Sequence, residues 1–338
     1  MAPNDDVVVV GGAGFIGRHL VQALKGRVRS ITVVSRGVND GHVDRSGVRY
    51  RRGDIQSLDT AKRVLEGASV VYDLSLPIGA TWDDFHERCV GCAKNLAEAA
   101  RQHAARRVVY TGTSDSVYLG AKKVVDERDG TDAKPHLRNS YSSGKAAAEK
   151  VLFDLHRSQG FPAIVFRPFL VVGRGGRMPH GGIGLWVAEN CCLGWGRGDN
   201  PQPFVLVEDV ADAMAAAIDV PGIEGRAFNL AGDVCISARE YVRLIAERSM
   251  RDFRIYPRNL AHLWMKELLV NSIKRLVGRG GARQSYRDMV SSSKQSTVDC
   301  SAAKEVLGWK PNASLERFRA EAIDSYFEIQ AGDLRLEA

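Results

Sequence analysis

The sequence lacks long hydrophobic runs and a basic start, and each absence argues against a class of protein. No apolar stretch among the 338 residues reaches the ~18 residues that a membrane-spanning helix needs. The chain starts Met1-Ala2-Pro3-Asn4-Asp5-Asp6, which is acidic where a signal peptide is basic, and Val7–Val10 is too short for its apolar core. We therefore expect a cytoplasmic protein.

The chain also has too few cysteines, glycines and prolines for any of these residue types to determine its fold class. The 34 glycines and 11 prolines exclude a collagen-like chain, and the 44% hydrophobic content excludes a disordered one. Cys89 and Cys92 form a C-x-x-C pair without the second pair that a zinc site needs. Because the surrounding stretch has helical spacing, we expect both to pack inside a helix, as free thiols in a reducing compartment, and we predict no metal site.

The net charge of +7 is concentrated in one late segment. Residues 248–294 carry eleven Lys or Arg against three acids, so the rest of the chain is close to neutral. No recognised nucleic-acid-binding module accompanies this charge, and we expect no nucleic-acid partner.

Short apolar runs alternate with stretches of helical spacing through the first half of the chain. This alternation predicts an α/β fold with a doubly wound parallel sheet. The predicted strands are Val7–Val10, Ile31–Val34, Ser69–Leu74, Arg107–Thr111, Ala163–Phe166 and Val205–Val207. The predicted helices are 18–24, 60–66, 85–103, 146–156, 239–248, 260–277 and 315–327, and Gly173–Gly184 is predicted to be a mobile loop.

Three glycines stand between the first predicted strand and the first predicted helix. Gly11, Gly14 and Gly17 have the spacing G-x-x-G-x-x-G, which permits a tight turn, a close approach of pyrophosphate and close helix–strand packing. The helix N-terminus, with Phe15 and Ile16, then presents N–H groups to the phosphates. This arrangement predicts a Rossmann-type dinucleotide-binding site.

The end of the second predicted strand bears on the choice of cofactor. An acid at this position binds the ribose 2′-hydroxyl, whereas a basic residue accommodates a 2′-phosphate. Ser35 takes the place of the acid and Arg36 follows it, so we predict that NADP is preferred over NAD. The alternative is a solvated Arg36 beside a pocket that accepts NAD.

Tyr141 and Lys145 are four residues apart at the start of a predicted helix, so they share one face. Asn139 and Ser140 are the candidate helix caps. A phenol is a poor acid or base at neutral pH, and a neighbouring ammonium would lower its pKa. Ser114 follows the preceding strand and is placed to hydrogen-bond the substrate oxygen. We therefore predict a catalytic set of Tyr141, Lys145 and Ser114.

With these motifs the chain resembles the extended short-chain dehydrogenases/reductases of the NAD(P)-dependent epimerase/dehydratase type. The resemblance spans nearly the whole length. Its further motifs are Gly53-Asp54-Ile55, Asn95–Ala100, Arg167-Pro168-Phe169, Phe204–Ala213 and Ala303–Trp309.

The resemblance implies a role for each matching residue. It implies Tyr141 as acid/base, Lys145 on the nicotinamide ribose and Ser114 as the group that polarises the reacting oxygen. It also implies cofactor contacts from Asp54, Ile55, Leu74, Pro168 and Phe169. It implies a smaller C-terminal substrate lobe of residues 171–203 and 233–338, beside a cofactor domain of residues 1–170 to which 204–232 return.

The chain also departs from the family pattern. Sugar-nucleotide epimerases usually carry Asn where this chain has Leu170, Arg where it has Gln202, and an Arg-Pro-Gly-Asp element near Met289–Ser292. Arg174, Arg177 and Arg197 are candidate replacements for the lost phosphate contacts, although a solvated loop arginine is the simpler interpretation of each. Asp115 is followed by Ser116 and not by a second carboxylate, which disfavours dehydration.

The helix predicted over 260–277 combines apolar positions at helical spacing with Lys266, Lys274 and Arg275. Such a helix fits peripheral contact with an anionic membrane. The alternative is a lobe helix that packs on the core and exposes its lysines.

The leading hypothesis is an NAD(P)-dependent oxidoreductase or epimerase that transfers hydride at a carbinol or carbonyl carbon. The resemblance implies a nucleotide-linked sugar as its small-molecule substrate, and we expect a homodimer. One alternative is a carbonyl reductase like 3β-hydroxysteroid dehydrogenases or dihydroflavonol reductases, which would consume NADPH and release its cofactor in each cycle. Another is a non-catalytic NADP-binding sensor.

Overall fold

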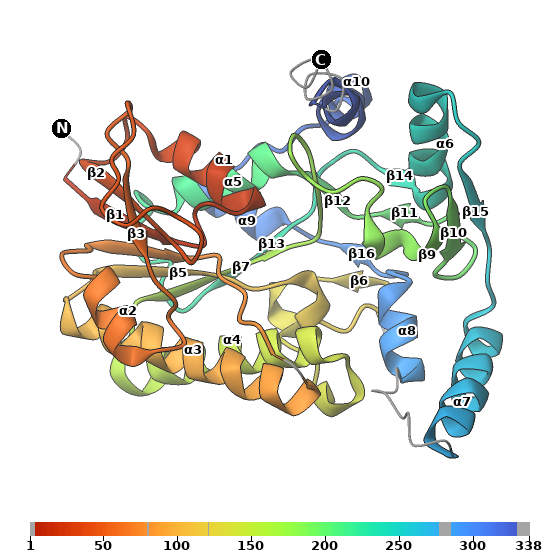
Figure 1. Ribbon diagram of the computed structural model, residues 1–338, viewed down its shortest axis with the longest axis horizontal. Coiled ribbons are helices and arrows are strands. Elements are labelled where there is room, and N and C mark those ends of the chain that lie inside the picture. The colour runs from red at the N-terminus through yellow and green to blue at the C-terminus, as the bar shows by residue number, and fades with distance from the viewer. Residues whose placement is uncertain (1–3, 80, 121, 277–284, 330–338) are drawn as a thin grey trace.

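A seven-stranded parallel sheet forms the centre of the protein, which is described here from a computed structural model covering residues 4–79, 81–120, 122–276 and 285–329, with the backbone alone at 274–276. The strand order is β13-β7-β5-β4-β1-β2-β3 (Figure 1). Its strands are β1 (Asp6–Val10), β2 (Ser30–Ser35), β3 (Arg49–Arg52), β4 (Val70–Asp73), β5 (Arg107–Thr111), β7 (Ala163–Pro168) and β13 (Ala227–Leu230). The prediction of a doubly wound α/β fold is confirmed.

Helices cover both faces of this sheet because its β-branched strands are apolar on both sides (Figure 1). Val7 and Val9 of β1 pack on one face, with α1 (Phe15–Leu24), α5 (Val207–Ala216) and α9 (Ser301–Leu307). Val8 and Val10 pack on the other, with α2 (Leu58–Val64), α3 (Trp82–Gln102) and α4 (Ser140–Gln159). The side chains of β1 point alternately to the two faces of the sheet and so contribute to two separate hydrophobic cores.

A smaller lobe stands beyond the carboxyl ends of the strands and has a core of its own, which includes Leu170, Phe204 and Tyr241. Its small sheets pair β8 (Leu170–Val172) with β12 (Phe204–Leu206), β11 (Pro201–Gln202) with β14 (Ile236–Ser237), and β10 (Cys191–Gly194) with β9 (Gly184–Ala188) and β15 (Arg254–Tyr256). Another pair joins β6 (Val124–Val125) to β16 (Thr297–Val298). The late helices are α6 (Ala238–Ser249), α7 (Leu260–Leu276), α8 (Tyr286–Ser292) and α10 (Leu315–Arg319).

Several elements differ from the sequence prediction. The strands β3 and β13 were not predicted, because β3 is an edge strand with the sequence Arg-Tyr-Arg-Arg and β13 has only four residues. The strand β12 was predicted to continue the sheet, but it pairs with β8 outside it, since the chain leaves the main sheet at Pro168, which has no N–H. The predicted helix 315–327 is helical throughout, as α10, a π-helical turn at Ala320–Asp324 and a further α-helical stretch over 325–329, so only the π-turn was not predicted.

Cys89 and Cys92 are buried in α3 and pack against the sheet as free thiols, which confirms the helix prediction. No described helix combines the length and hydropathy needed to cross a bilayer. Val277 and the basic residues Arg279 and Arg283 of the late segment lie outside the described residues, as do residues 1–3.

Candidate active site

The glycine turn joins β1 to α1 at the centre of the carboxyl edge of the sheet. Gly11 has φ +77°, and a Cβ on it would lie 2.8 Å from the backbone carbonyl of Leu74. A Cβ on Gly17 would lie 2.5 Å from the carbonyl oxygen of Gly11. Side chains at these positions would clash with backbone, so the turn requires glycine. No described side chain caps α1, whose first turn carries no acid, which leaves its N–H groups available to an anion.

A cavity of about 210 Å³ lies between the ends of β2 and β4, on one side of this turn. Its walls include Ser35, Arg36, Asp54, Ile55 and Leu74. The Arg36 Nη1 atom lies 3.7 Å from Asp54 Oδ2, and both side chains are partly exposed. This cavity therefore has a buried floor and a charged mouth.

A second cavity of about 270 Å³ shares Gly11, Gly14 and Leu74 with the first and continues along the sheet edge. Its walls also include Phe15, Ile16, Gly17, Tyr141, Lys145, Pro168 and Phe169. Every residue predicted to bind the cofactor therefore lines one of these two adjoining cavities.

The start of α4 carries Tyr141 and Lys145 into the second cavity. Asn139 caps the helix by accepting a hydrogen bond from the Ser142 N–H at 2.9 Å, as expected. Lys145 is buried, and its Nζ donates to the carbonyl oxygens of Thr111 (3.0 Å) and Ser75 (3.2 Å). These bonds hold the ammonium group near the ends of β4 and β5, where Lys145 lines the cavity.

Burial shifts the pKa values of both Lys145 and Tyr141. It lowers the pKa of Lys145, an effect that the nearby Asp73 carboxylate opposes. It raises the pKa of Tyr141 to about 12, although a hydrogen bond with Thr113 opposes the shift. The expectation that Lys145 lowers the pKa of Tyr141 is thus wrong for this structure, because desolvation of the phenol dominates. Tyr141 is a protonated acid at neutral pH.

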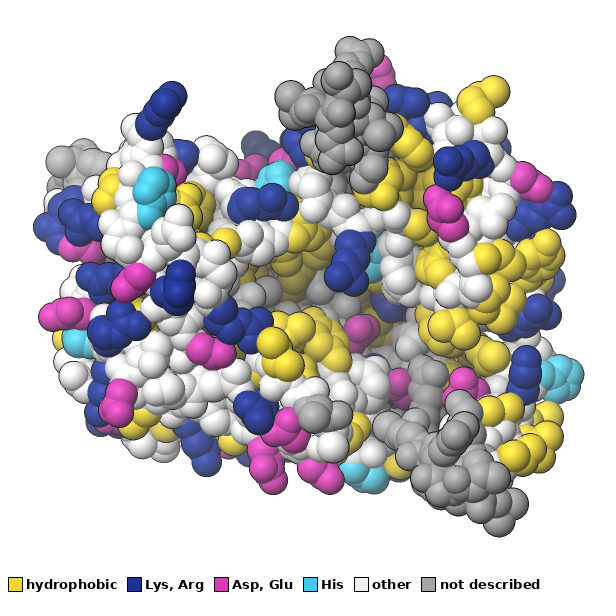
Figure 2. Space-filling view, viewed as in Figure 1, with side chains coloured by type: hydrophobic (Ala, Val, Ile, Leu, Met, Phe, Trp, Pro, Cys, Tyr) yellow, Lys and Arg dark blue, Asp and Glu magenta, His cyan; other side chains and the backbone are white. Residues whose placement is uncertain are grey.

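A third cavity, of about 520 Å³, meets the second at Tyr141 and Phe169. It lies between the sheet and the C-terminal lobe, where Figure 2 shows the face of the molecule hollowed. Ser114 is buried in its wall, close to Tyr141 as the sequence predicts. We call this cavity the substrate cleft.

Sequence reasoning missed several polar residues that line the substrate cleft. Thr113 is the hydrogen-bond partner of Tyr141, and His180, Trp195 and Lys294 come from the lobe. The strand end Thr111-Gly112-Thr113-Ser114 signals Thr113 as much as Ser114. Nothing local signals the lobe residues, because long loops bring them to the site.

Of the arginines proposed as replacement phosphate contacts, Arg174 pairs with Glu328 at 3.4 Å and Arg197 with Asp199 at 3.8 Å. None of Arg174, Arg177 and Arg197 is among the described residues that line the cleft. Leu170 does line the cleft, whereas Gln202 is buried in β11 and donates to the Asn200 carbonyl at 3.3 Å.

A buried ionic network ties α8 to the start of α4. Arg138, next to the cap residue, donates to Asp132 (3.0 Å) and to Asp288 of α8 (3.0 Å). Asp288 also accepts from the Asn139 side chain at 3.1 Å. The position of Tyr141 therefore depends on a helix nearly 150 residues further along the chain.

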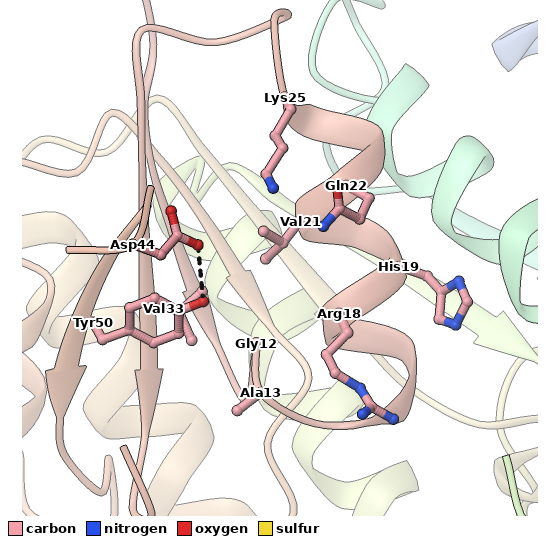
Figure 3. Close-up of a pocket in the computed structure, with 10 residues that line it drawn as sticks. All are labelled: Gly12, Ala13, Arg18, His19, Val21, Gln22, Lys25, Val33, Asp44 and Tyr50. Atoms are coloured by element: carbon pink, nitrogen blue, oxygen red, sulfur yellow. Dashed lines mark hydrogen bonds between the residues drawn. The ribbon is translucent and has the colours of Figure 1, made fainter. Parts of the chain in front are cut away.

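A separate pocket lies along α1 and the segment that leads to β3 (Figure 3). Tyr50 donates to Asp44 at 3.3 Å on one side, and Arg18, Gln22 and Lys25 line the other. It contains none of the residues predicted to bind the cofactor or to act in catalysis.

Comparisons with known proteins bear on the family and the fold of this chain. Residues 7–231 match the model of the NAD dependent epimerase/dehydratase family. The UDP-glucose 4-epimerase of Vibrio cholerae is 22% identical over 317 residues, which cover 92% of each chain. The 3beta-hydroxysteroid-dehydrogenase/decarboxylase isoform 1 of Arabidopsis thaliana is 25% identical over 360 residues, which cover 96% of this chain and 80% of the relative.

Solved structures match over almost the whole chain. The structure of gox2253 has a TM-score of 0.75 at 20% identity and covers 97% of this chain and 99% of its own. The complex of MoeE5 with UDP-glucuronic acid and NAD has a TM-score of 0.71 at 24% identity, with 96% and 99% covered. At these identities the likeness concerns the fold.

Proposed function

Since this chain belongs to the NAD-dependent epimerase/dehydratase family, we propose that it transfers hydride at a carbinol or carbonyl carbon of a nucleotide-linked sugar. The observation that carries the proposal is the position of Tyr141, which lines both the cofactor cavity and the substrate cleft. Relatives named UDP-glucose 4-epimerase and UDP-glucuronic acid decarboxylase favour this substrate class.

The active-site residues have two roles, which are proton transfer and positioning of the substrate and the cofactor. A bound nicotinamide supplies or accepts the hydride. In the direction of reduction, the protonated Tyr141 gives its proton to the substrate oxygen, which becomes a hydroxyl. In the direction of oxidation the phenolate takes that proton back. Ser114 donates to the same oxygen, and Lys145, held by two carbonyls, orients the cofactor ribose.

The walls of the substrate cleft favour a polar substrate. Asp115, His180 and Lys294 give it charged and hydrogen-bonding groups, and Phe169 and Leu170 give it apolar ones. A second candidate, reduction of an apolar ketone, draws support from these apolar residues and from the hydroxysteroid-dehydrogenase relatives. A non-catalytic NADP-binding sensor would have no use for Tyr141 at the junction of the two cavities.

Replacement of the phenol tests the chemistry. Tyr141→Phe should lower turnover of UDP-glucose or UDP-glucuronic acid by at least about 10²-fold, because general acid–base catalysis contributes 10²–10⁴-fold. Cofactor affinity should stay the same, measured by fluorescence titration. Tyr50→Phe makes the same change in the separate pocket and should leave turnover intact. An undiminished rate in Tyr141→Phe would remove this residue from the mechanism.

Cofactor retention separates the epimerase from the reductase. An epimerase restores its cofactor in each cycle and can retain it, whereas a reductase must exchange it. With no carboxylate at Ser35, we expect NADPH exchange and stoichiometric consumption with a ketone. Protein purified without nucleotide is denatured, and released dinucleotide is counted per chain. A nearly empty site supports exchange, whereas near-full occupancy by NAD after dialysis would restore the epimerase.

A further inference from the structure

Lys294 is a nearly buried cation whose head faces the substrate cleft. Its side chain is 3% exposed, and the residue lines the cleft together with Tyr141. It is the one Lys or Arg among the described residues of that wall. The residue follows α8, and the Asn200 amide donates to its carbonyl at 2.9 Å. Its backbone φ is +48°, a conformation that favours Gly or Asn over a long side chain.

Among the described residues, the ammonium has a counter-charge but no hydrogen-bond acceptor. Asp115 Oδ1 lies 3.7 Å from Nζ, which is an ion pair beyond hydrogen-bond reach. No hydrogen bond between the described residues involves this Nζ, although an ammonium has three donors. The ammonium borders the cleft with donors that no described residue takes up, so it is available to an acceptor that enters there.

The imidazole of His180 lines the same wall and can assist as a neutral donor. Its Nδ1 accepts a hydrogen bond from the Gly182 N–H at 2.9 Å, so the ring hydrogen resides on Nε2. Burial first, and then the charge of Lys294, lowers the pKa of His180 to about 4, which keeps the ring uncharged at neutral pH. Lys294 therefore supplies the positive charge of this part of the cleft.

We propose that Lys294 binds an anionic oxygen of the substrate, from a carboxylate or a phosphate group, and so selects acidic substrates. Asp115 holds the ammonium until the substrate enters. Its side chain is 37% exposed, so water can solvate the carboxylate when the ammonium turns to the substrate. The inference rests on the proposed function, because it describes how the same cleft chooses its substrate.

The test measures anion binding to protein saturated with NADH, so that the glycine turn is already occupied. Isothermal titration calorimetry gives dissociation constants for UDP-glucuronic acid, UDP-glucose, UDP, D-glucuronate and inorganic phosphate. The proteins are wild type, Lys294→Met, Lys294→Arg and Asp115→Asn. Lys150→Met is the matched control, since Lys150 pairs with Asp154 on the outer side of α4.

Lys294→Met should weaken binding by about tenfold or more, as expected for loss of a charge-assisted hydrogen bond. Weakening confined to UDP-glucuronic acid and D-glucuronate identifies a carboxylate, whereas equal weakening for UDP, UDP-glucose and phosphate identifies a phosphate. Lys294→Arg should retain binding. Asp115→Asn should tighten it, a change that a merely structural ion pair would not produce.

Two results would overturn the proposal. One is that Lys294→Met, shown to be folded by its melting temperature and NADH affinity, keeps all the affinities within about twofold of wild type. The other is that wild type binds none of the probes. If Lys294→Met does not fold, unchanged affinities in Asp115→Asn overturn the proposal instead. If the protein binds phosphate or D-glucuronate through Lys294 but binds no UDP compound, the proposal for Lys294 stands and the nucleotide-linked substrate is rejected.

Discussion

Arg36 stands at the mouth of the cavity between the ends of β2 and β4, which we propose to hold the adenosine of the cofactor. Its guanidinium is about half exposed and lies 3.7 Å from Asp54, so it is tethered but not buried. No carboxylate occupies the end of β2, where Ser35 stands. A 2′-phosphate entering there would meet this cation and would compete with Asp54 for it.

Removing this charge should erase a preference for NADPH. Arg36→Ala should lose about 1.5–3 kcal/mol of NADPH binding, the range for a hydrogen bond to a charged group, and little NADH binding. Arg157→Ala, which removes another exposed and ion-paired arginine from the outer side of α4, should change neither. Fluorescence titration with both cofactors provides the measurement. Equal affinities for NADPH and NADH in the wild type would show that Arg36 faces solvent only.

The two halves of the active site differ in how far the sequence predicts them. Short-range patterns predict one half: the glycines lie in one turn, Tyr141 and Lys145 lie on one helix, and Arg36 follows one strand. These residues line the two adjoining cavities as expected. Thr113 was overlooked beside Ser114. His180 and Lys294 reach the cleft only through the packing of the lobe, which no local pattern encodes.

At the scale of elements, α8 and α4 behave as one unit because buried charges join them. Arg138 is placed between Asp132 and Asp288, and Arg287 of α8 also pairs with Asp132. The network lies directly before the first turn of α4, where Asn139 accepts and donates. A shift of α8 would therefore move Tyr141 as well as Lys294.

Cutting this network should be far more damaging than cutting a surface pair. Asp288→Ala should lower the free energy of unfolding by about 3–5 kcal/mol, since it leaves the charge of Arg138 partly uncompensated. Asp154→Ala removes an exposed carboxylate that pairs with Lys150 and Arg157, and should cost at most about 1 kcal/mol. Urea denaturation of both variants gives the comparison. Similar losses in the two would mean that the network adds nothing beyond surface pairing.

On the scale of the whole molecule, α7 stands at one end of the lobe and exposes an apolar stripe (Figures 1 and 2). Met265, Leu269 and Ile273 follow one another at intervals of four residues and are more than half exposed. Leu260 is buried on another side, and the Trp264 ring lies 5.7 Å from Tyr286. The helix thus packs against the protein and also presents apolar groups outward, beside exposed Arg258 and Lys266.

This stripe should bind anionic membranes. Vesicles of phosphatidylcholine with phosphatidylserine should carry the wild type upward in flotation, and phosphatidylcholine alone should carry less. Leu269→Glu places a charge on a side chain that is 63% exposed and should abolish flotation. Leu315→Glu makes the same change at a 49% exposed leucine of α10 and should have no effect. Equal flotation of all three proteins would exclude α7 as the contact.

The face of the sheet that carries Val7 and Val9 is covered in part by α9, a helix that is synthesised late. Val7, Val9 and Leu20 share one core with Ala303 and Leu307 of α9, and β13 closes the sheet edge only at residues 227–230. Helix α1 covers part of this face early, but a ribosome must add almost the whole remaining chain before α5 and α9 complete the cover. During this interval the nascent protein exposes a valine-rich surface that is prone to aggregate. Overproduction should thus depend on chaperones that bind the growing chain, and a fragment ending at residue 170 should be insoluble.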